Sequence, residues 1–307
     1  HWFPPLVTGI VITAIGLALL PVGIKYASGG AAAFQMNAPE WGDFSRWGLA
    51  LVVIFVALGF KFFTRGTMSS AAILIGLIAG YVVGYLTGAV NFGGVAKAAW
   101  FAVPEPFKYG IEFSAFAIIG MCLMSLVSAI ETVGDISGIA KGGANREATD
   151  KELSGGTYAD GFGSFIAGLF GGLPNTSFSQ NVGLISMTGV MSRSVVTLGA
   201  LFLVACGLIP KVGAIVAAMP ISVLGGGVIV MFGMVVSAGI NMLSGVNWNR
   251  RNMIILAMSL SVGLGIQAVP KSMQHLPDSF EMLMVSGLLP AAAISVILNL
   301  LIPKDID

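Results

Sequence analysis

Apolar residues follow one another along this chain in long blocks that are separated by short polar stretches. A membrane-spanning helix needs about 20 predominantly apolar residues. On that basis we predict ten apolar segments, at residues 3–24, 47–63, 69–90, 111–138, 159–173, 180–192, 194–210, 221–243, 252–269 and 280–302. The pattern predicts an all-α, multi-pass membrane protein whose fifth and sixth segments are too short to cross the bilayer alone.

The composition supports a membrane environment for most of the surface. Hydrophobic residues make up 56% of the chain and charged residues 9%, whereas a soluble domain carries roughly 25% charged residues. The 42 glycines fit helices that pack closely, as membrane bundles allow. We therefore expect the lipid bilayer to be the main partner of this surface.

Charge and reactive residues exclude several classes of function. The net charge of +1 gives no reason to expect a nucleic-acid partner. Cys122 and Cys206 both lie in apolar runs, where cysteine behaves as a small hydrophobic residue. Because the sequence holds no metal-ligand spacing and no nucleophile motif, we expect no enzyme activity, no catalytic residues, no metal and no cofactor.

Loop charge predicts the orientation of the chain. An even number of spans places both termini on one side of the membrane. With the termini in the cytoplasm, inside loops carry nine Lys and Arg residues and outside loops carry six, which favours this orientation. The polar stretch 141–153 is then a cytoplasmic loop, and we expect the chain to reside in the inner (plasma) membrane.

The first candidate site is Ser128-Ala-Ile-Glu131-Thr-Val-Gly134-Asp135, at the end of a strongly apolar run. If the helix continues to about residue 139, Glu131 lies inside the membrane and Asp135 lies one turn later on the same face. A carboxylate there marks an ion path or a substrate site and can take up and release a proton. If the helix ends near Ile130, both carboxylates are solvated loop residues.

The second candidate site, residues 171–183, is a polar break between the two short apolar runs. Pro174 and the polar cluster after it stop a helix, so two half-helices around an unwound segment are predicted. Such backbone must line a cavity or be buried in protein. Gln180 and Asn181 would lie at this opening, near the middle of the bilayer. An ordinary outside loop between two short helices is the alternative.

The two sites together indicate a flat heterocyclic substrate. A carboxylate accepts hydrogen bonds, whereas a primary amide both donates and accepts them. An oxidised purine or pyrimidine presents alternating ring N–H and C=O groups. Glu131 could accept from one or two N–H groups, Gln180 could pair with a lactam edge, and Phe178 could stack on the ring or simply pack.

Three sequence blocks resemble the nucleobase–ascorbate transporter family of nucleobase:cation symporters. The signature Gln/Glu-Asn-x-Gly-x-x-x-x-Thr is matched by Gln180, Asn181, Gly183 and Thr188. Pro174-Asn175-Thr176 and Glu131-Thr-Val-Gly134-Asp135 also look like that family. The three blocks occur in the family's order, and the resemblance covers the whole chain.

The resemblance implies an inverted-repeat transporter fold with a core domain and a gate domain. Mapped onto this chain, residues 1–109 and 211–307 are gate helices and residues 110–210 are core helices that hold the substrate site. A discontinuous helix and a short strand are implied near 174–180. The first four helices of the family fold have no counterpart, so we expect the sequence to be truncated at its N-terminus. A homodimer is also expected from the resemblance.

The resemblance also assigns roles to individual residues. Glu131 corresponds to the substrate-binding, proton-linked carboxylate and Gln180 to the second substrate contact. Asp135 and Asn181 correspond to supporting polar positions, and the backbone of Phe178 and Ser179 to the strand that faces the substrate.

The identity of residue 180 implies a purine substrate. Gln180 is similar to the purine branch, which takes xanthine or urate, because uracil permeases carry Glu there. Val182 replaces an Asn often found in xanthine carriers, which favours urate. The implied function is purine transport coupled to protons, with sodium less favoured, by alternating access. The alternatives are an anion carrier of the same fold, of the sulfate or bicarbonate type, and a non-transporting membrane sensor or fragment.

Overall fold

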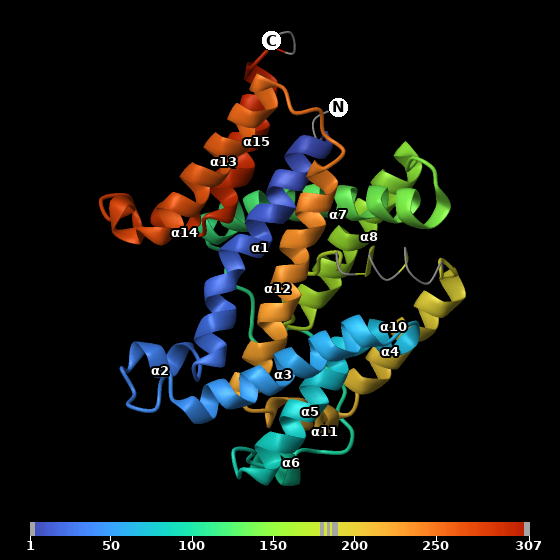
Figure 1. Cartoon of the computed structure of the whole chain (residues 1–307), viewed down its shortest axis with the longest axis vertical. Helices are drawn as coiled ribbons and strands as arrows, with labels where there is room; N and C mark the ends of the chain where they lie inside the picture. Colours follow the sequence, from blue (N-terminus) through green and yellow to red (C-terminus); the bar gives the residue numbers. More distant parts are fainter. Residues whose placement is uncertain (1–3, 179–180, 183–184, 186–189, 304–307) are drawn as a thin grey trace. The chain divides into compact units, whose positions relative to one another are not determined.

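The computed structural model describes residues 4–178, 181–182, 185 and 190–303. These residues form helices, and no β-strand occurs among them. The helices are α1 (Pro5–Ala27), α2 (Ala31–Gln35), α3 (Phe44–Phe63), α4 (Thr67–Ser70), α5 (Ala72–Leu86), α6 (Gly93–Lys97), α7 (Ala115–Ala144), α8 (Asp150–Leu169), α10 (Arg193–Gly207), α11 (Pro210–Ala217), α12 (Ile221–Leu243), α13 (Arg250–Ala268), the 3₁₀ helix η1 (Pro270–Met273), α14 (Asp278–Val285) and α15 (Leu288–Leu301) (Figure 1).

Several of these helices are long and apolar enough to cross a membrane. In the part of the chain that the structure describes, five meet that condition, namely α1, α3, α7, α12 and α13. The pair α10 and α11, bent by 85°, makes a sixth candidate if it forms one span. The helices α5 and α15 are apolar but shorter. The described residues thus agree with the prediction of an all-α chain with several membrane-spanning helices, and the inverted repeat stays a prediction.

Two predicted segments have different boundaries in the structure. The segment 280–302 is not one continuous helix, because α14 ends at Val285 and α15 begins at Leu288. Between them, Gly287 has a φ of 72°, a left-handed conformation that interrupts a right-handed helix and suits glycine. The segment 194–210 continues across a sharp bend into α11, which begins with Pro210 at its first position.

The predicted cytoplasmic loop 141–153 is mostly helical. The helix α7 ends at Ala144 and α8 begins at Asp150, so only residues 145–149 connect them. Thr149 caps α8 in a capping box with Glu152, which satisfies backbone N–H groups at the helix start. Arg146 donates to both carboxylate oxygens of Glu152 at 2.6 and 2.8 Å. These bonds, with those from Thr149, hold the pKa of Glu152 well below its usual range.

The chain divides into two compact units. The first contains His1–Ala18, Pro106–Ser186 and Gly233–Asp307, and the second contains Leu19–Glu105 and Met187–Phe232. The predicted gate and core ranges, 1–109, 110–210 and 211–307, stay a prediction.

Each unit has an apolar core of its own. In the first unit, the core joins Val11 of α1, Val127 and Ile130 of α7, and Leu289 of α15. There α13 and α15 lie side by side. In the second unit, Leu49 and Val53 of α3 pack with Val223 of α12, and α3 lies along α5 (Figure 1). The first unit holds both candidate sites of the sequence.

The position of α7 in the first unit depends on a glycine between the two predicted carboxylates. Gly134 is buried against Thr8 of α1, and a methyl group on its Cα would overlap Thr8 Cγ2. Thr8 is itself 2% exposed, so it has little room to move away. The close contact at Gly134 therefore fixes how deeply the segment that carries Glu131 and Asp135 lies against α1.

Replacing Gly134 by Ala is expected to destabilise the first unit. Overpacking of a close contact typically costs about 1–3 kcal/mol, and this exceeds the gain of up to about 1 kcal/mol from Ala over Gly in a helix. We expect a lower Tm for the purified protein in detergent. Thr8→Ser, which removes the overlapping Cγ2, is expected to restore part of the loss.

Gly120 provides the matched control on the same helix. Its nearest neighbour would lie 3.4 Å from an added Cβ, an ordinary contact distance. Gly120→Ala is expected to leave the Tm unchanged or slightly higher. Equal Tm values for the two alanine variants would contradict the proposed packing role of Gly134.

Candidate functional site

The helix α7 carries both predicted carboxylates inside its regular part. It begins after Ser114, whose side chain accepts a hydrogen bond from the N–H of Ala117, and it continues to Ala144. Glu131 and Asp135 therefore lie one turn apart on the same helical face. Glu131 is half-buried and Asp135 is 4% exposed. The alternative in which this helix ends near Ile130 is wrong.

Residues 174–178 have no regular secondary structure and contact this face of α7. Thr176 Oγ1 donates to Glu131 Oε2 at 3.2 Å. Ser177 Oγ donates to Asp135 Oδ2 at 2.5 Å. The structure thus brings the polar break predicted from the sequence directly against the two carboxylates of α7.

A third carboxylate belongs to the same hydrogen-bonded group. Asp160 of α8 accepts from Thr132 Oγ1 at 2.8 Å, and Ser128 Oγ lies 3.4 Å from the same oxygen, Oδ2. Ser128 Oγ also lies 3.0 Å from Thr176 Oγ1. Asp160 was not predicted as a site residue from the sequence. The sequence offered one signal for this residue, since Asp160 is an acidic residue in a glycine-rich stretch. It was overlooked because the predicted apolar run began at residue 159, which put Asp160 at the edge of that run.

The helix α8 differs from the half-span that was predicted there. The run 159–173 was expected to be a short helix before the break, yet α8 has 20 residues and ends at Leu169. Gly171, with a φ of 71°, follows its end. Ser164 of α8 then fixes the segment beyond, since its hydroxyl accepts from the N–H of Asn175 at 2.8 Å and lies 3.2 Å from the Asn175 carbonyl oxygen.

Other predicted site residues are described only in part. Phe178 is 52% exposed and lies in the segment without regular structure. The implied strand is not present over residues 174–178. Asn181 is exposed, and its backbone N–H donates to the Phe178 carbonyl at 2.9 Å. The remaining predicted residues, Ser179, Gln180, Gly183 and Thr188, lie outside the described residues.

Val182, which lies within the family-like signature, also contacts α7. An added Cβ on Gly138 would lie 2.8 Å from Val182 Cγ1. Gly138 is one turn beyond Gly134 on α7. Residues on both sides of positions 179–180, namely Ser177 and Val182, are therefore in contact with this helix.

The chemistry available at the site is proton exchange and hydrogen bonding to polar groups. Three carboxylates lie within reach of four hydroxyl groups, on α7, α8 and residues 176–177. Ionised carboxylates accept hydrogen bonds, and hydroxyl groups both donate and accept them. Among the residues that the structure describes, no group of three His, Cys, Asp or Glu side chains is arranged to hold a metal ion.

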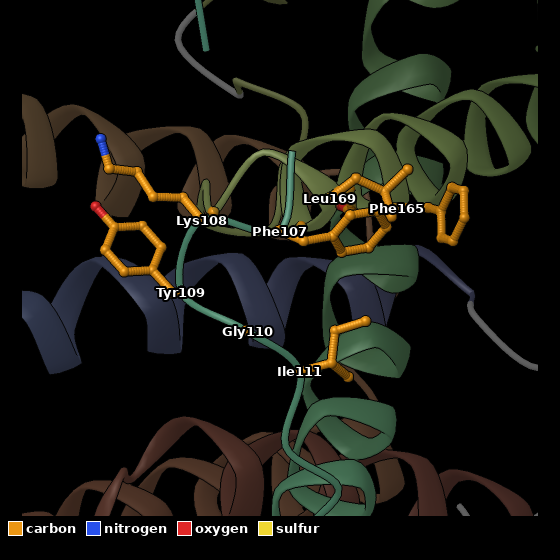
Figure 2. A pocket seen from close by; sticks show the side chains of 10 residues that line it. Phe107, Lys108, Tyr109, Gly110, Ile111, Phe165 and Leu169 are labelled. Atoms are coloured by element: carbon orange, nitrogen blue, oxygen red, sulfur yellow. The ribbon is translucent and has the colours of Figure 1, made fainter. Parts of the chain in front are cut away.

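A pocket of about 290 Å³ lies close to this site in the same unit. It is formed by residues 107–111 and the C-terminal part of α8. Figure 2 shows Phe107 directed towards Leu169 and Phe165, whereas Lys108 and Tyr109 point to the other side. Ser164 lines this pocket and also binds Asn175, but no carboxylate of the site contributes to the pocket lining.

Comparison with known proteins identifies the family. The Xan_ur_permease model, described as the permease family, matches residues 1–272. The chain is 36% identical over 301 residues to the xanthine permease of Bacillus subtilis, with 97% of this chain and 67% of the relative covered. It is 37% identical over 300 residues to the uric acid transporter UacT of Escherichia coli, and the match covers 97% of this chain and 61% of that relative. The uric acid permease PucJ of Bacillus subtilis is 35% identical to this chain, and the match covers 97% of this chain and 67% of that relative.

The chain thus spans about two thirds of the length of these relatives. The relatives are named as permeases or transporters, which confirms the expectation that the chain is not an enzyme. The resemblance drawn from the three sequence blocks is confirmed as well. Since one family model matches residues 1–272 and each of these relatives shares more than a third of the aligned residues, the chain belongs to this permease family and is a multi-pass membrane protein.

Proposed function

We propose that this chain forms part of a permease that carries a purine nucleobase, xanthine or uric acid, across the inner (plasma) membrane. Transport is coupled to protons and proceeds by alternating access. Two of the relatives are named for xanthine and for uric acid, and purine transport is the function that the site chemistry supports best.

The observation that carries the proposal is the contact between the polar break and α7. Thr176 and Ser177 donate to Glu131 and Asp135, so a segment without regular structure faces an acidic group on a neighbouring helix. Unwound backbone inside a membrane protein lines a cavity or is buried in protein. A planar ring with N–H donors can lie beside this contact and donate to the carboxylate of Glu131.

In the proposed complex, Glu131 accepts ring N–H groups and Gln180 pairs with a lactam edge of the purine. The contacts of Ser177 and Val182 with α7 support a position of Gln180 near Glu131. Phe178 and Ser179 face the substrate, while Asp135 and Asn181 support the site.

The proposal includes the larger organisation of the protein. Residues 110–210 form the core that moves against the gate helices, as alternating access requires. The permease acts as a homodimer.

The acidic character of the site argues against an anion carrier of the same fold. A sulfate or bicarbonate site would favour cationic groups or helix N-termini, whereas this site gathers Glu131, Asp135 and Asp160. Uptake of labelled xanthine or urate, measured beside uptake of labelled sulfate, separates the two functions. A protein that binds purine but never accumulates it in proteoliposomes would instead be a sensor.

The Glu131→Gln variant tests the proton-linked role of the carboxylate. An amide neither takes up nor releases a proton in the physiological pH range, and it loses the charge-assisted hydrogen bonds to the ring N–H groups. Proton-driven purine uptake by the complete gene product is expected to fall by at least about tenfold, as loss of 1.5–3 kcal/mol implies. Membrane insertion is expected to be normal.

Glu112→Gln serves as the control for that variant. Glu112 is exposed and precedes α7, so uptake is expected to remain unchanged. Undiminished proton-driven uptake by Glu131→Gln would remove Glu131 from the mechanism.

The Gln180→Glu variant tests the second substrate contact. A carboxylate has no N–H donors, so it places acceptors opposite the purine carbonyl. Purine affinity is expected to fall by about tenfold, and uracil is expected to compete with purine better than it does in the unaltered protein. Competition assays measure both effects, with the exposed Gln274→Glu as control. An unaltered substrate profile for Gln180→Glu would exclude this residue from the site.

A further inference from the structure

Two hydroxyl groups connect the carboxylate of α8 to the carboxylate of α7. Ser128 Oγ lies 3.4 Å from Asp160 Oδ2 and 3.0 Å from Thr176 Oγ1. Thr176 Oγ1 lies 3.2 Å from Glu131 Oε2. Asp160, Ser128, Thr176 and Glu131 therefore form a continuous hydrogen-bonded path that runs from one helix, through the unwound segment, to another.

We propose that Asp160, Ser128 and Thr176 form a proton relay that loads and unloads Glu131 during transport. This inference rests on the proposed function of the chain. Each hydroxyl carries one proton and two lone pairs, so it can accept from one neighbour and donate to the next. No further group is required between the two carboxylates.

The transfer balances without any external reactant. The O–H bond of protonated Asp160 breaks and its proton joins Ser128 Oγ. The original proton of Ser128 moves to Thr176 Oγ1, and the original proton of Thr176 moves to Glu131 Oε2. Asp160 becomes a carboxylate, Glu131 becomes a carboxylic acid, and both hydroxyls keep one proton each. The reverse sequence unloads Glu131.

The rest of the site separates this path from the neighbouring carboxylate. Thr132, 3% exposed, donates to Asp160 Oδ2, which orients the oxygen that faces Ser128. Asp135 receives its hydrogen bond from a different residue, Ser177. Ser128 and Thr132 are one turn apart on α7 and face Asp160, whereas Glu131 faces residue 176. A proton can thus reach Glu131 from the side of α8 while a substrate occupies the other side.

Matched hydroxyl substitutions distinguish a relay from a purely structural contact. Thr176→Val keeps the shape of the side chain but removes the hydroxyl, and Thr176→Ser keeps the hydroxyl but removes the methyl group. Ser128→Ala removes the second hydroxyl. Ser125→Ala is the control, since Ser125 is an exposed residue one turn earlier on α7.

The experiment uses the complete gene product in proteoliposomes and compares two measurements. The first is exchange of labelled xanthine for unlabelled xanthine, which requires no net protonation of Glu131. The second is uphill accumulation of xanthine driven by an imposed pH gradient. Ser128→Ala and Thr176→Val are expected to lose uphill accumulation by about a hundredfold, as loss of a proton-transfer group implies, and to lose exchange by a much smaller factor. Thr176→Ser and Ser125→Ala are expected to behave like the unaltered protein.

Each other outcome overturns the relay in an identifiable way. Normal uphill accumulation by Thr176→Val and Ser128→Ala would show that the proton takes another route. Equal loss of exchange and accumulation by both variants would show that the hydroxyls only hold residues 174–178 in place. Accumulation driven by sodium and not by protons would contradict the relay but would agree with purine transport. Absence of purine exchange in the unaltered protein would remove the proposed function, and the relay with it.

Discussion

The hydrogen bonds between residues 176–177 and the carboxylates of α7 are the interaction on which the candidate site depends. A segment without regular structure leaves backbone and side-chain polar groups to be satisfied, and lipid offers none of the necessary partners. Glu131 and Asp135 supply acceptors for this segment. The same contact places an acidic group beside unwound backbone, and the proposed purine site rests on this arrangement.

Helix packing sets the geometry of this contact. Gly134 allows α7 to approach α1 closely at the turn between the two carboxylates. The capping box and the Arg146–Glu152 pair define where α8 begins, and Asp160 lies within that helix. Ser164 holds Asn175 on the other side of the segment. Residues 174–178 are thus attached to two helices, α7 and α8, by direct hydrogen bonds.

The sequence predicted the parts of the structure that depend on residue spacing. The carboxylates of α7 were predicted to share one face, and the polar break at 171–183 was predicted between two short apolar runs, because helical periodicity and long apolar runs are local properties. That this break lies near the carboxylates was inferred from the chemistry of the two sites and from the family resemblance. The start of α8 could have been read from Thr149 and Glu152, which form a capping box, but the charged residues there were interpreted as a loop.

Other features could not be read from local spacing. The role of Asp160 depends on how α8 is rotated towards Ser128 and Thr132, which only tertiary packing decides. The break at Gly287 also depends on tertiary packing, since a glycine in an apolar run is compatible with a continuous helix or with a positive φ.

An experimental structure of the complete gene product with bound xanthine or uric acid tests the central claim most directly. The account predicts a purine whose ring N–H groups lie within hydrogen-bond distance of the Glu131 carboxylate, with residues 174–181 along its other edge. A purine bound elsewhere, such as in the pocket beside Phe107 and Phe165, with Glu131 out of reach, would contradict it.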